Sequence, residues 1–248
     1  MRVGLFIPCY VDQLRPETGL ATVELLEEQG IDFAYPPDQT CCGQAFLSAG
    51  AAPQARRLAQ RYVEIFSGFD HVVTPSGSCA ATMRRHLPHL VPGADAARLA
   101  AATFELCEFL VDVAKLANLP GRLDARVGLH ASCHALRELR LGAASELSEP
   151  GRTDPARQLL EGLRGVEIVE LARRDECCGF GGVFALEEEA VSTRMGLDRL
   201  DDHLRASAQI ITSTDVSCLL HLEGLASRRA LPLRVRHIAE LLAGRTLE

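Results

Sequence analysis

Four segments in the first part of this chain recur, in the same order, in the second part, and this duplication restricts the possible folds more than any other feature. "MRVGLFIPCYVDQL" matches "ARVGLHASCHALRELRLG", "GIDFAYPPDQTCCGQAF" matches "GVEIVELARRDECCGFGG", "DHVVTPSGSCAATM" matches "AQIITSTDVSCLLHL", and "FELCEFLVDV" matches "VRHIAELLAG". Matches in one order indicate an internal repeat rather than chance similarity. We therefore predict two repeats, residues 1–120 and 121–248, joined near residues 118–126, where "NLPGRLDA" carries turn-forming residues.

Strands and helices alternate within each repeat. "VGLFI" and "HVVTP" have the short apolar pattern of buried strands, while "PETGLATVELLEEQG" has a helical pattern with Pro16 near its start and Gly30 at its end. Such alternation is typical of sheets whose strands run parallel. The predicted fold class is α/β: two tandem homologous α/β repeats with mostly parallel sheets, related by an approximate two-fold axis.

Composition and charge limit the class of protein, its partners and its cellular compartment. Hydrophobic residues make up 47% of the chain and charged residues 24%, as in ordinary globular proteins, and the net charge of -7 argues against nucleic acid as a partner. The start "MRVGLFIPCY" reads as a first strand rather than a signal peptide, and no apolar run reaches the roughly 18 residues of a membrane span. We expect a cytoplasmic protein, in which nine cysteines serve as metal ligands or reactive thiols rather than as disulfides.

The repeat divides the nine cysteines into two groups. Eight of them align in pairs: Cys9 with Cys133, Cys41 with Cys177, Cys42 with Cys178, and Cys79 with Cys218. In each repeat they follow the first, second and third predicted strands, and the carboxyl ends of parallel strands gather at one edge of a sheet. We therefore expect the four sulfurs of each repeat to converge. Cys107 aligns with Ala239 in an apolar helical stretch, which predicts a small buried hydrophobic residue.

Converging thiolates indicate a metal site. Four thiolates suit a [4Fe-4S] cluster or a structural zinc ion. Zinc sites made only of cysteine usually contain C-x-x-C, which this chain lacks, whereas adjacent cysteines can bind different irons of one cluster. We predict that the eight paired cysteines hold one or two [4Fe-4S] clusters, with zinc as the rival at one site. No catalytic residue is predicted, because "GFGG" lacks the spacing of a dinucleotide fingerprint and "SGSC" lacks the glycines of a nucleophile elbow.

Several motifs resemble one known family over nearly the whole chain. "PCYVDQLRPETGLATVELLE", "CCGQAFLSAG", "PSGSCA", "HASCHALRELRLG" and "CCGFGGVFALEEEAVSTRMGLDRL" are similar to the cysteine-rich (CCG) family, and within it to the lactate utilization protein A branch. Relatives include the B subunit of heterodisulfide reductase and the iron–sulfur subunit of glycolate oxidase. The resemblance implies a cytoplasmic iron–sulfur subunit that works with a ferredoxin-like subunit and a third subunit to oxidise L-lactate to pyruvate.

The chain departs from the fullest form of the family motif at one position in each repeat. That form ends in C-x-x-C, but the last position is Thr82 in the first repeat and His221 in the second. Four cysteines per repeat remain instead of five, which favours an ordinary four-thiolate cluster over the disulfide-cleaving clusters of the heterodisulfide reductase relatives. We expect His221, and His134 beside Cys133, to be hydrogen-bonding neighbours of the metal site rather than ligands.

Two functions from different classes follow from the sequence. In the first, the protein is an electron-transfer subunit, itself not catalytic, that relays electrons between a partner dehydrogenase and an acceptor. In the second, it is a zinc-stapled subunit whose role is assembly. A third function, thiol–disulfide chemistry like that of heterodisulfide reductase, is weakened by the missing fifth cysteines. Iron and acid-labile sulfide in the anaerobically purified protein separate the first function from the second.

Overall fold

The computed structural model describes residues 1–116, 119–146 and 152–245. We call residues 1–116 the first half and residues 119–245 the second half. The first half contains, in chain order, β1 (Val3–Leu5), α1 (Cys9–Leu14), α2 (Pro16–Glu28), β2 (Phe33–Ala34), α3 (Gln44–Ser48), α4 (Ala52–Phe66), β3 (His71–Thr74), α5 (Gly77–Leu90), α6 (Ala94–Ala101), β4 (Thr103–Glu105), α7 (Leu106–Glu108) and the π-helical turn η1 (Phe109–Val113). The second half contains β5 (Arg122–Leu129), the π-helical turn η2 (His134–Glu138), α8 (Pro155–Glu161), β6 (Arg164–Ile168), α9 (Phe184–Glu187), α10 (Glu189–Arg205), β7 (Ile210–Ser213), α11 (Val216–Arg228), β8 (Arg234–His237) and α12 (Ile238–Leu242).

Each half builds one four-stranded sheet, and the two sheets have the same strand order. The first runs β2-β1-β3-β4 and the second runs β6-β5-β7-β8, with every paired strand parallel to its neighbour. Val3 pairs with His71 at the centre of the first sheet, and Val127 pairs with Ile210 at the centre of the second. The predicted fold class, with two tandem α/β repeats, is confirmed.

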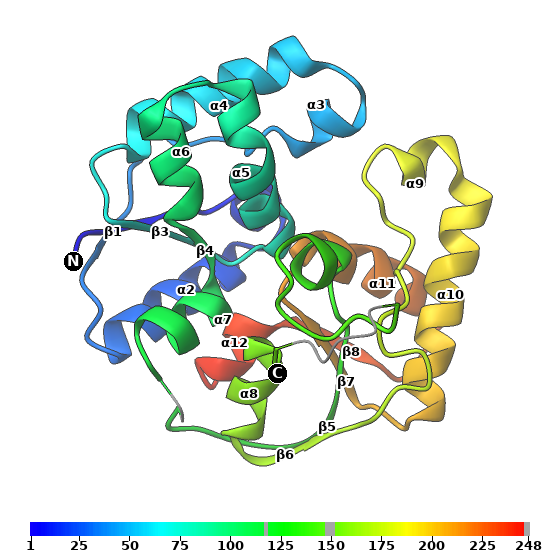
Figure 1. The fold of residues 1–248 in the computed structure, drawn as a ribbon. Coiled ribbons are helices and arrows are strands. Elements are labelled where there is room, and N and C mark those ends of the chain that lie inside the picture. Colours follow the sequence, from blue (N-terminus) through cyan, green and yellow to red (C-terminus); the bar gives the residue numbers. More distant parts are fainter. Residues whose placement is uncertain (117–118, 147–151, 246–248) are drawn as a thin grey trace.

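Helices cover both faces of each sheet, and the inner helices lie between the two sheets (Figure 1). Helices α4, α5 and α6 cover the outer face of the first sheet, and α10 and α11 cover the outer face of the second. One continuous apolar core joins the inner faces, and it contains Leu25 of α2, Leu106 of α7, Leu159 of α8 and Leu242 of α12. A hydrogen bond of 2.7 Å from Thr18 Oγ1 to Glu240 Oε1 also connects α2 with α12. The inner helices of the two halves therefore form a single shared layer.

The period-two pattern of each strand decides which side chains reach this shared layer. In β1, Val3 and Leu5 point into the shared core, and in β5 Val127 occupies the same place. The residues between them face the outer helices. Because β1 ends at Leu5 and β5 ends at Leu129, Cys9 and Cys133 follow these strands at the carboxyl edge of each sheet.

The predicted junction at residues 118–126 differs in part from the structure. Residue 118 lies outside the described residues, while β5 begins at Arg122, so the later part of the segment is strand rather than turn. The strand continues because Ala125 and Val127 pair with β6 and turn their apolar side chains to the shared core. The division into domains 1–120 and 121–248 stays a prediction. Among the described residues, no helix combines the length and the apolar character that crossing a membrane requires.

Candidate metal centre

In the first half, three loops at the carboxyl edge of the sheet carry the four aligned cysteines. Cys9 begins α1 just after β1, Cys41 and Cys42 lie in the loop between β2 and α3, and Cys79 lies in the first turn of α5 after β3. The strand order places β1 between β2 and β3, so these loops are neighbours. Ser76 caps α5, because its hydroxyl accepts a hydrogen bond of 3.3 Å from the Cys79 backbone N–H, which fixes the start of the helix that holds Cys79.

The second half places its cysteines in the same way. Cys133 follows β5 at the start of η2, Cys177 and Cys178 lie in the loop between β6 and α9, and Cys218 lies in the first turn of α11 after β7. The strand order β6-β5-β7 again brings the three loops together.

All eight paired cysteines line one cavity between the two halves, with a volume of about 260 Å³. Side chains from opposite halves meet across it. Tyr10 and Phe180 pack edge to face with ring centres 6.0 Å apart, and the side-chain nitrogen of Gln44 lies 2.7 Å from His134 Nε2. The expected convergence of sulfurs occurs in each half, and the two sets face the same cavity.

The four sulfurs of the first half form a connected series. Cys9 Sγ lies 3.6 Å from Cys41 Sγ, and the Cys42 thiol contacts both Cys41 and Cys79. Hydrogen bonds from Cys42, from Cys9 and from the Gly43 backbone N–H lower the pKa of Cys41 to about 3. The hydrogen bond to Cys41 raises the pKa of Cys9, and burial raises it further. One thiolate, stabilised by neighbouring thiols, is therefore the favoured state of this set.

The second half has the same series. Cys177 contacts Cys133 and Cys178, and Cys178 also contacts Cys218. Hydrogen bonds from Cys133 and Cys178 lower the pKa of Cys177, while the pKa values of Cys133 and Cys178 are raised, chiefly by donating to it. Each half thus keeps its thiolate on the first cysteine of the Cys-Cys-Gly motif.

The glycine of each motif brings a backbone donor to that thiolate. Gly43 and Gly179 donate from their N–H groups to Cys41 Sγ and Cys177 Sγ, each at 3.3 Å. Both glycines have positive φ angles, +87° and +90°, which residues with a side chain adopt only at an energetic cost. A Cβ at Gly179 would also lie 2.6 Å from the Ser192 carbonyl oxygen, so this turn requires glycine.

A buried aspartate that lines the cavity joins the two halves. Asp215 precedes α11, but it accepts hydrogen bonds from the Ser78 backbone N–H at 2.8 Å and from the Ser78 hydroxyl at 2.7 Å, both in the first half. It also accepts from Ser76 Oγ at 3.2 Å and from Ser132 Oγ at 2.6 Å. The Gly77 N–H donates to the Thr214 carbonyl at 3.0 Å. The equivalent turns of the two halves therefore contact each other, as segments close to an approximate two-fold axis can.

Three residues that the sequence placed near the cysteines have other partners. His221 Nε2 lies 3.3 Å from the Ser192 carbonyl oxygen, and Thr82 donates from its hydroxyl to the Ser78 carbonyl at 2.8 Å. His134 lines the cavity and lies 3.6 Å from Glu138 in addition to its contact with Gln44.

Cys107 is fully buried in the shared core, away from the cavity that the other eight cysteines line.

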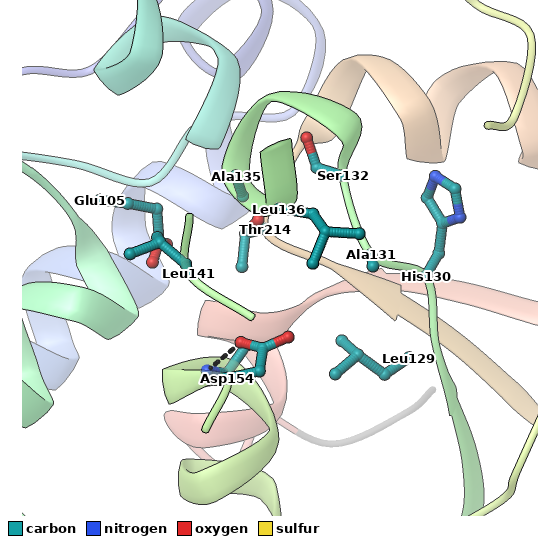
Figure 2. A pocket seen from close by; sticks show the side chains of 11 residues that line it. Glu105, Leu129, His130, Ala131, Ser132, Ala135, Leu136, Leu141, Asp154 and Thr214 are labelled. Atoms are coloured by element: carbon teal, nitrogen blue, oxygen red, sulfur yellow. Dashed lines mark hydrogen bonds between the residues drawn. The ribbon is translucent and has the colours of Figure 1, made fainter. Parts of the chain in front are cut away.

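A much smaller cavity lies at the junction of the halves, beside the buried carboxyls of Glu105 and Asp154 (Figure 2). Its volume of about 10 Å³ leaves room for roughly one water molecule. Burial raises the pKa of Glu105 to about 8 and that of Asp154 to about 6. Cysteines are not among its described lining residues, but His130 lines it, so this cavity adjoins the surroundings of the second cysteine set.

Sequence reasoning missed two residues of the centre. Asp215 was visible only as a break in an apolar run, although its alignment with Ser76, a capping residue, is a signal of a buried hydrogen-bonding position. His130 aligns with Phe6 in a strand that is otherwise apolar. It is fully buried, and burial lowers its pKa to about 4, which keeps the ring neutral. A polar residue inside a buried strand was the signal that could have found it.

The donor set fits a thiophilic metal group. Each half offers four converging sulfurs, a thiolate already favoured before metal binds, and a backbone N–H directed at that sulfur. Gly181 and Gly182 line the cavity, and a Cβ on Gly182 would meet nothing within 4 Å, so space for a bulky group remains beside the second set. Soft thiolates select iron–sulfur clusters or zinc over hard cations such as magnesium.

A family profile and the sequences of curated proteins agree on the family of this chain. The profile of the CCG cysteine-rich domain matches residues 3–84 and again residues 127–223. A protein from Geobacillus kaustophilus called lactate utilization protein A is 39% identical over 99% of this chain and 100% of its own length. Proteins of the same name from Geobacillus thermodenitrificans and an Exiguobacterium species are 36% and 38% identical, over 98% and 97% of this chain and 98% and 96% of their own lengths.

Proposed function

Because the chain belongs to the CCG cysteine-rich domain family, we propose that it is an iron–sulfur electron-transfer subunit of a system that oxidises L-lactate to pyruvate. The near full-length similarity to proteins named lactate utilization protein A supports this assignment. The proposed partners are a ferredoxin-like iron–sulfur subunit and a third subunit, in the cytoplasm. The sequence lacks a dinucleotide fingerprint, so we assign the two-electron step on lactate to a partner.

The observation that carries the proposal is the arrangement of eight thiols, in two equal sets, around one cavity. Cys9, Cys41, Cys42 and Cys79 would hold one [4Fe-4S] cluster, and Cys133, Cys177, Cys178 and Cys218 would hold the second. Bound clusters supply reversible one-electron transfer. Because both sets line one cavity, two clusters held there would be neighbours, which is the arrangement that an electron relay needs.

The chain's own residues tune this chemistry through hydrogen bonds and burial. The N–H groups of Gly43 and Gly179 stabilise negative charge on the thiolate that each of them contacts. Cys42 and Cys178 are buried, so water has little access to the inner side of each set. Tyr10 and Phe180 pack together across the cavity. Hydrogen bonds to sulfur and restricted solvent are both determinants of cluster potential.

Metal analysis of cysteine variants tests the proposal. Anaerobically reconstituted parent protein should be brown and contain iron and acid-labile sulfide, while Cys42→Ser and Cys178→Ser should each lose the iron of one half. Cys107→Ala is the matched control and should keep all of it, since Cys107 lies in the shared core. Normal iron in both serine variants would show that the wrong sulfurs were chosen.

The relay itself requires a functional measurement. A strain that lacks this gene should fail to grow on L-lactate as sole carbon source, the parent gene should restore growth, and the two serine variants should not. A colourless protein with stoichiometric zinc would instead support the zinc-stapled assembly subunit. That alternative has one observation in its favour, since an imidazole nitrogen of His130 lies within 4.8 Å of two thiols and zinc accepts both donors.

A further inference from the structure

Equivalent buried positions next to the two cysteine sets carry phenylalanine in the first half and histidine in the second. Phe6 and His130 each follow the central strand of their sheet by one residue, with both side chains buried. Phe6 packs against Phe66, with ring centres 5.7 Å apart, in the core that contains Cys42 and Cys79. The first half therefore has an apolar wall behind its sulfurs.

The second half replaces both members of this aromatic pair. Phe66 lies over Gly4 of β1, and His203 of α10 lies over the equivalent Gly128 of β5. Gly128 and His130 are two residues apart and so lie on one face of their strand. His203 is fully buried, like His130, and burial and the nearby Arg199 guanidinium lower the pKa of both rings. Two histidines thus occupy the place of two phenylalanines.

The histidine nitrogens have no protein partners. Neither ring nitrogen of His130, and neither ring nitrogen of His203, has a hydrogen-bond partner among the residues that the structure describes. A buried polar group without a partner costs roughly 1 to 3 kcal/mol, so two such rings in one place call for a ligand. One ring nitrogen of His130 lies within 4.8 Å of both Cys178 Sγ and Cys218 Sγ. Figure 2 shows His130 at the edge of the small cavity that it helps to line, with its ring on the side away from Leu129 and Asp154.

We propose that His130 is a nitrogen ligand of the metal group in the second half and takes the place of one of its four thiolates. The two cysteine sets then hold chemically different centres, with four thiolates in the first half and three thiolates and one imidazole in the second. The inference rests on the proposed function, because it takes the second set to hold an iron–sulfur cluster. His203 is a positioning residue in this arrangement. The partner of the other ring nitrogen generally orients a histidine ligand, and His203, packed over the same strand face, is the candidate for that role beside the buried Arg199.

Replacing one thiolate ligand by a neutral imidazole raises the reduction potential of an iron–sulfur centre. A neutral ligand stabilises the reduced state better than an anionic ligand does. The second centre should therefore have the higher potential and accept electrons from the first. The direction of the relay would then be encoded by Phe6 in one half and His130 in the other.

A labelling experiment on the unmodified sequence tests the ligand directly. The reconstituted chain is prepared with histidine containing either nitrogen-14 or nitrogen-15, and pulsed electron paramagnetic resonance is recorded on the paramagnetic form of the clusters. We expect a strong nitrogen hyperfine coupling that changes with the histidine isotope. Spectra that are the same for both isotopes would overturn the assignment without any substitution.

Variants then identify the histidine. His130→Phe copies the first half and should abolish the isotope-sensitive coupling and move one midpoint potential to a more negative value. His221→Phe is the control and should keep both, because His221 has a carbonyl partner. His203→Phe should change the coupling and the potential only while His130 is present. Coupling that survives His130→Phe, or that disappears in His221→Phe, would assign the nitrogen to another residue and refute the proposal.

Metal analysis of the same samples separates the two hypotheses. A parent chain without iron and sulfide would overturn the proposed function, and this inference with it. A parent chain that contains both, but whose spectra show no histidine nitrogen, would overturn only the role of His130.

Discussion

In each half, the helix that follows the last strand is capped by a titratable side chain, and the two side chains respond to pH in opposite ways. Glu105 accepts a hydrogen bond from the Glu108 N–H at 3.1 Å, and His237, at the equivalent position, accepts one from the Ala239 N–H at 3.2 Å. Both side chains are buried. Burial raises the pKa of Glu105 to about 8 and lowers the pKa of His237 to about 4, so both are neutral near pH 7. The fold requires a buried hydrogen-bond acceptor here, and either kind of neutral group provides it.

Of the substitutions that test this comparison, Glu105→Gln should change the pH dependence of the free energy of unfolding most. The folded-state pKa of about 8 lies above the ordinary value of 4.5, so the neutral carboxyl contributes stability that is complete below pH 4.5 and is lost as pH rises through 8. At about 1.4 kcal/mol per pH unit, the parent should lose roughly 5 kcal/mol across this range relative to Glu105→Gln. Urea unfolding at a series of pH values measures the difference. Parallel profiles for the two proteins would show that Glu105 is ionised in the folded state.

Replacing His237 by asparagine should produce the opposite slope at lower pH. The folded-state pKa of about 4 lies below 6.5, so the contribution of His237 is present above pH 6.5 and is lost as pH falls to about 4. Across this window the parent should lose roughly 3 kcal/mol relative to His237→Asn, which keeps a cap acceptor. The same urea series, extended to acid pH, checks it. A difference that grows above pH 6.5 would contradict the comparison.

The equivalent turns before α5 and α11 offer a third contrast. Ser76 caps its own helix, whereas Asp215 at the matching position accepts hydrogen bonds from the other half. Asp215→Asn places an amide against hydroxyl and N–H donors and should lower the free energy of unfolding by about 2 kcal/mol. Ser76→Ala, which removes the cap and one long hydrogen bond to Asp215, should cost about 1 kcal/mol. Equal losses in calorimetry would mean that Asp215 acts as a local cap only.

The smallest expected effect belongs to Cys107→Ala, which copies Ala239 of the second half into the first. One heavy atom leaves the shared core, so the free energy of unfolding should fall by about 1 kcal/mol. Denaturant titration of the reconstituted protein gives this value. A loss several times larger would indicate that Cys107 has a role that packing does not explain.

The sequence predicted those parts of the molecule that follow from local pattern. Strand and helix alternation, together with the matched segments, gave the two parallel sheets, and the position of each cysteine after a strand gave the convergence of the sulfurs. Two features depend on contacts between distant segments and could not be predicted in this way. The shared core joins α2 to α12, more than 200 residues apart, and Asp215 is satisfied by serines from both halves. His130 was obscured because a histidine inside an apolar strand has no partner that periodicity can identify.

The shared layer of α2, α7, α8 and α12 has a consequence for how such a chain could arise. Each half covers the inner face of its sheet partly with helices that also pack on the other half. A protein made of one half alone would expose that apolar surface and would associate with a second copy through it. In physical terms the present chain is such a dimer with its two subunits fused, and fusion has allowed one subunit to acquire histidines where the other has phenylalanines. Asymmetry of this kind is unavailable to two identical chains.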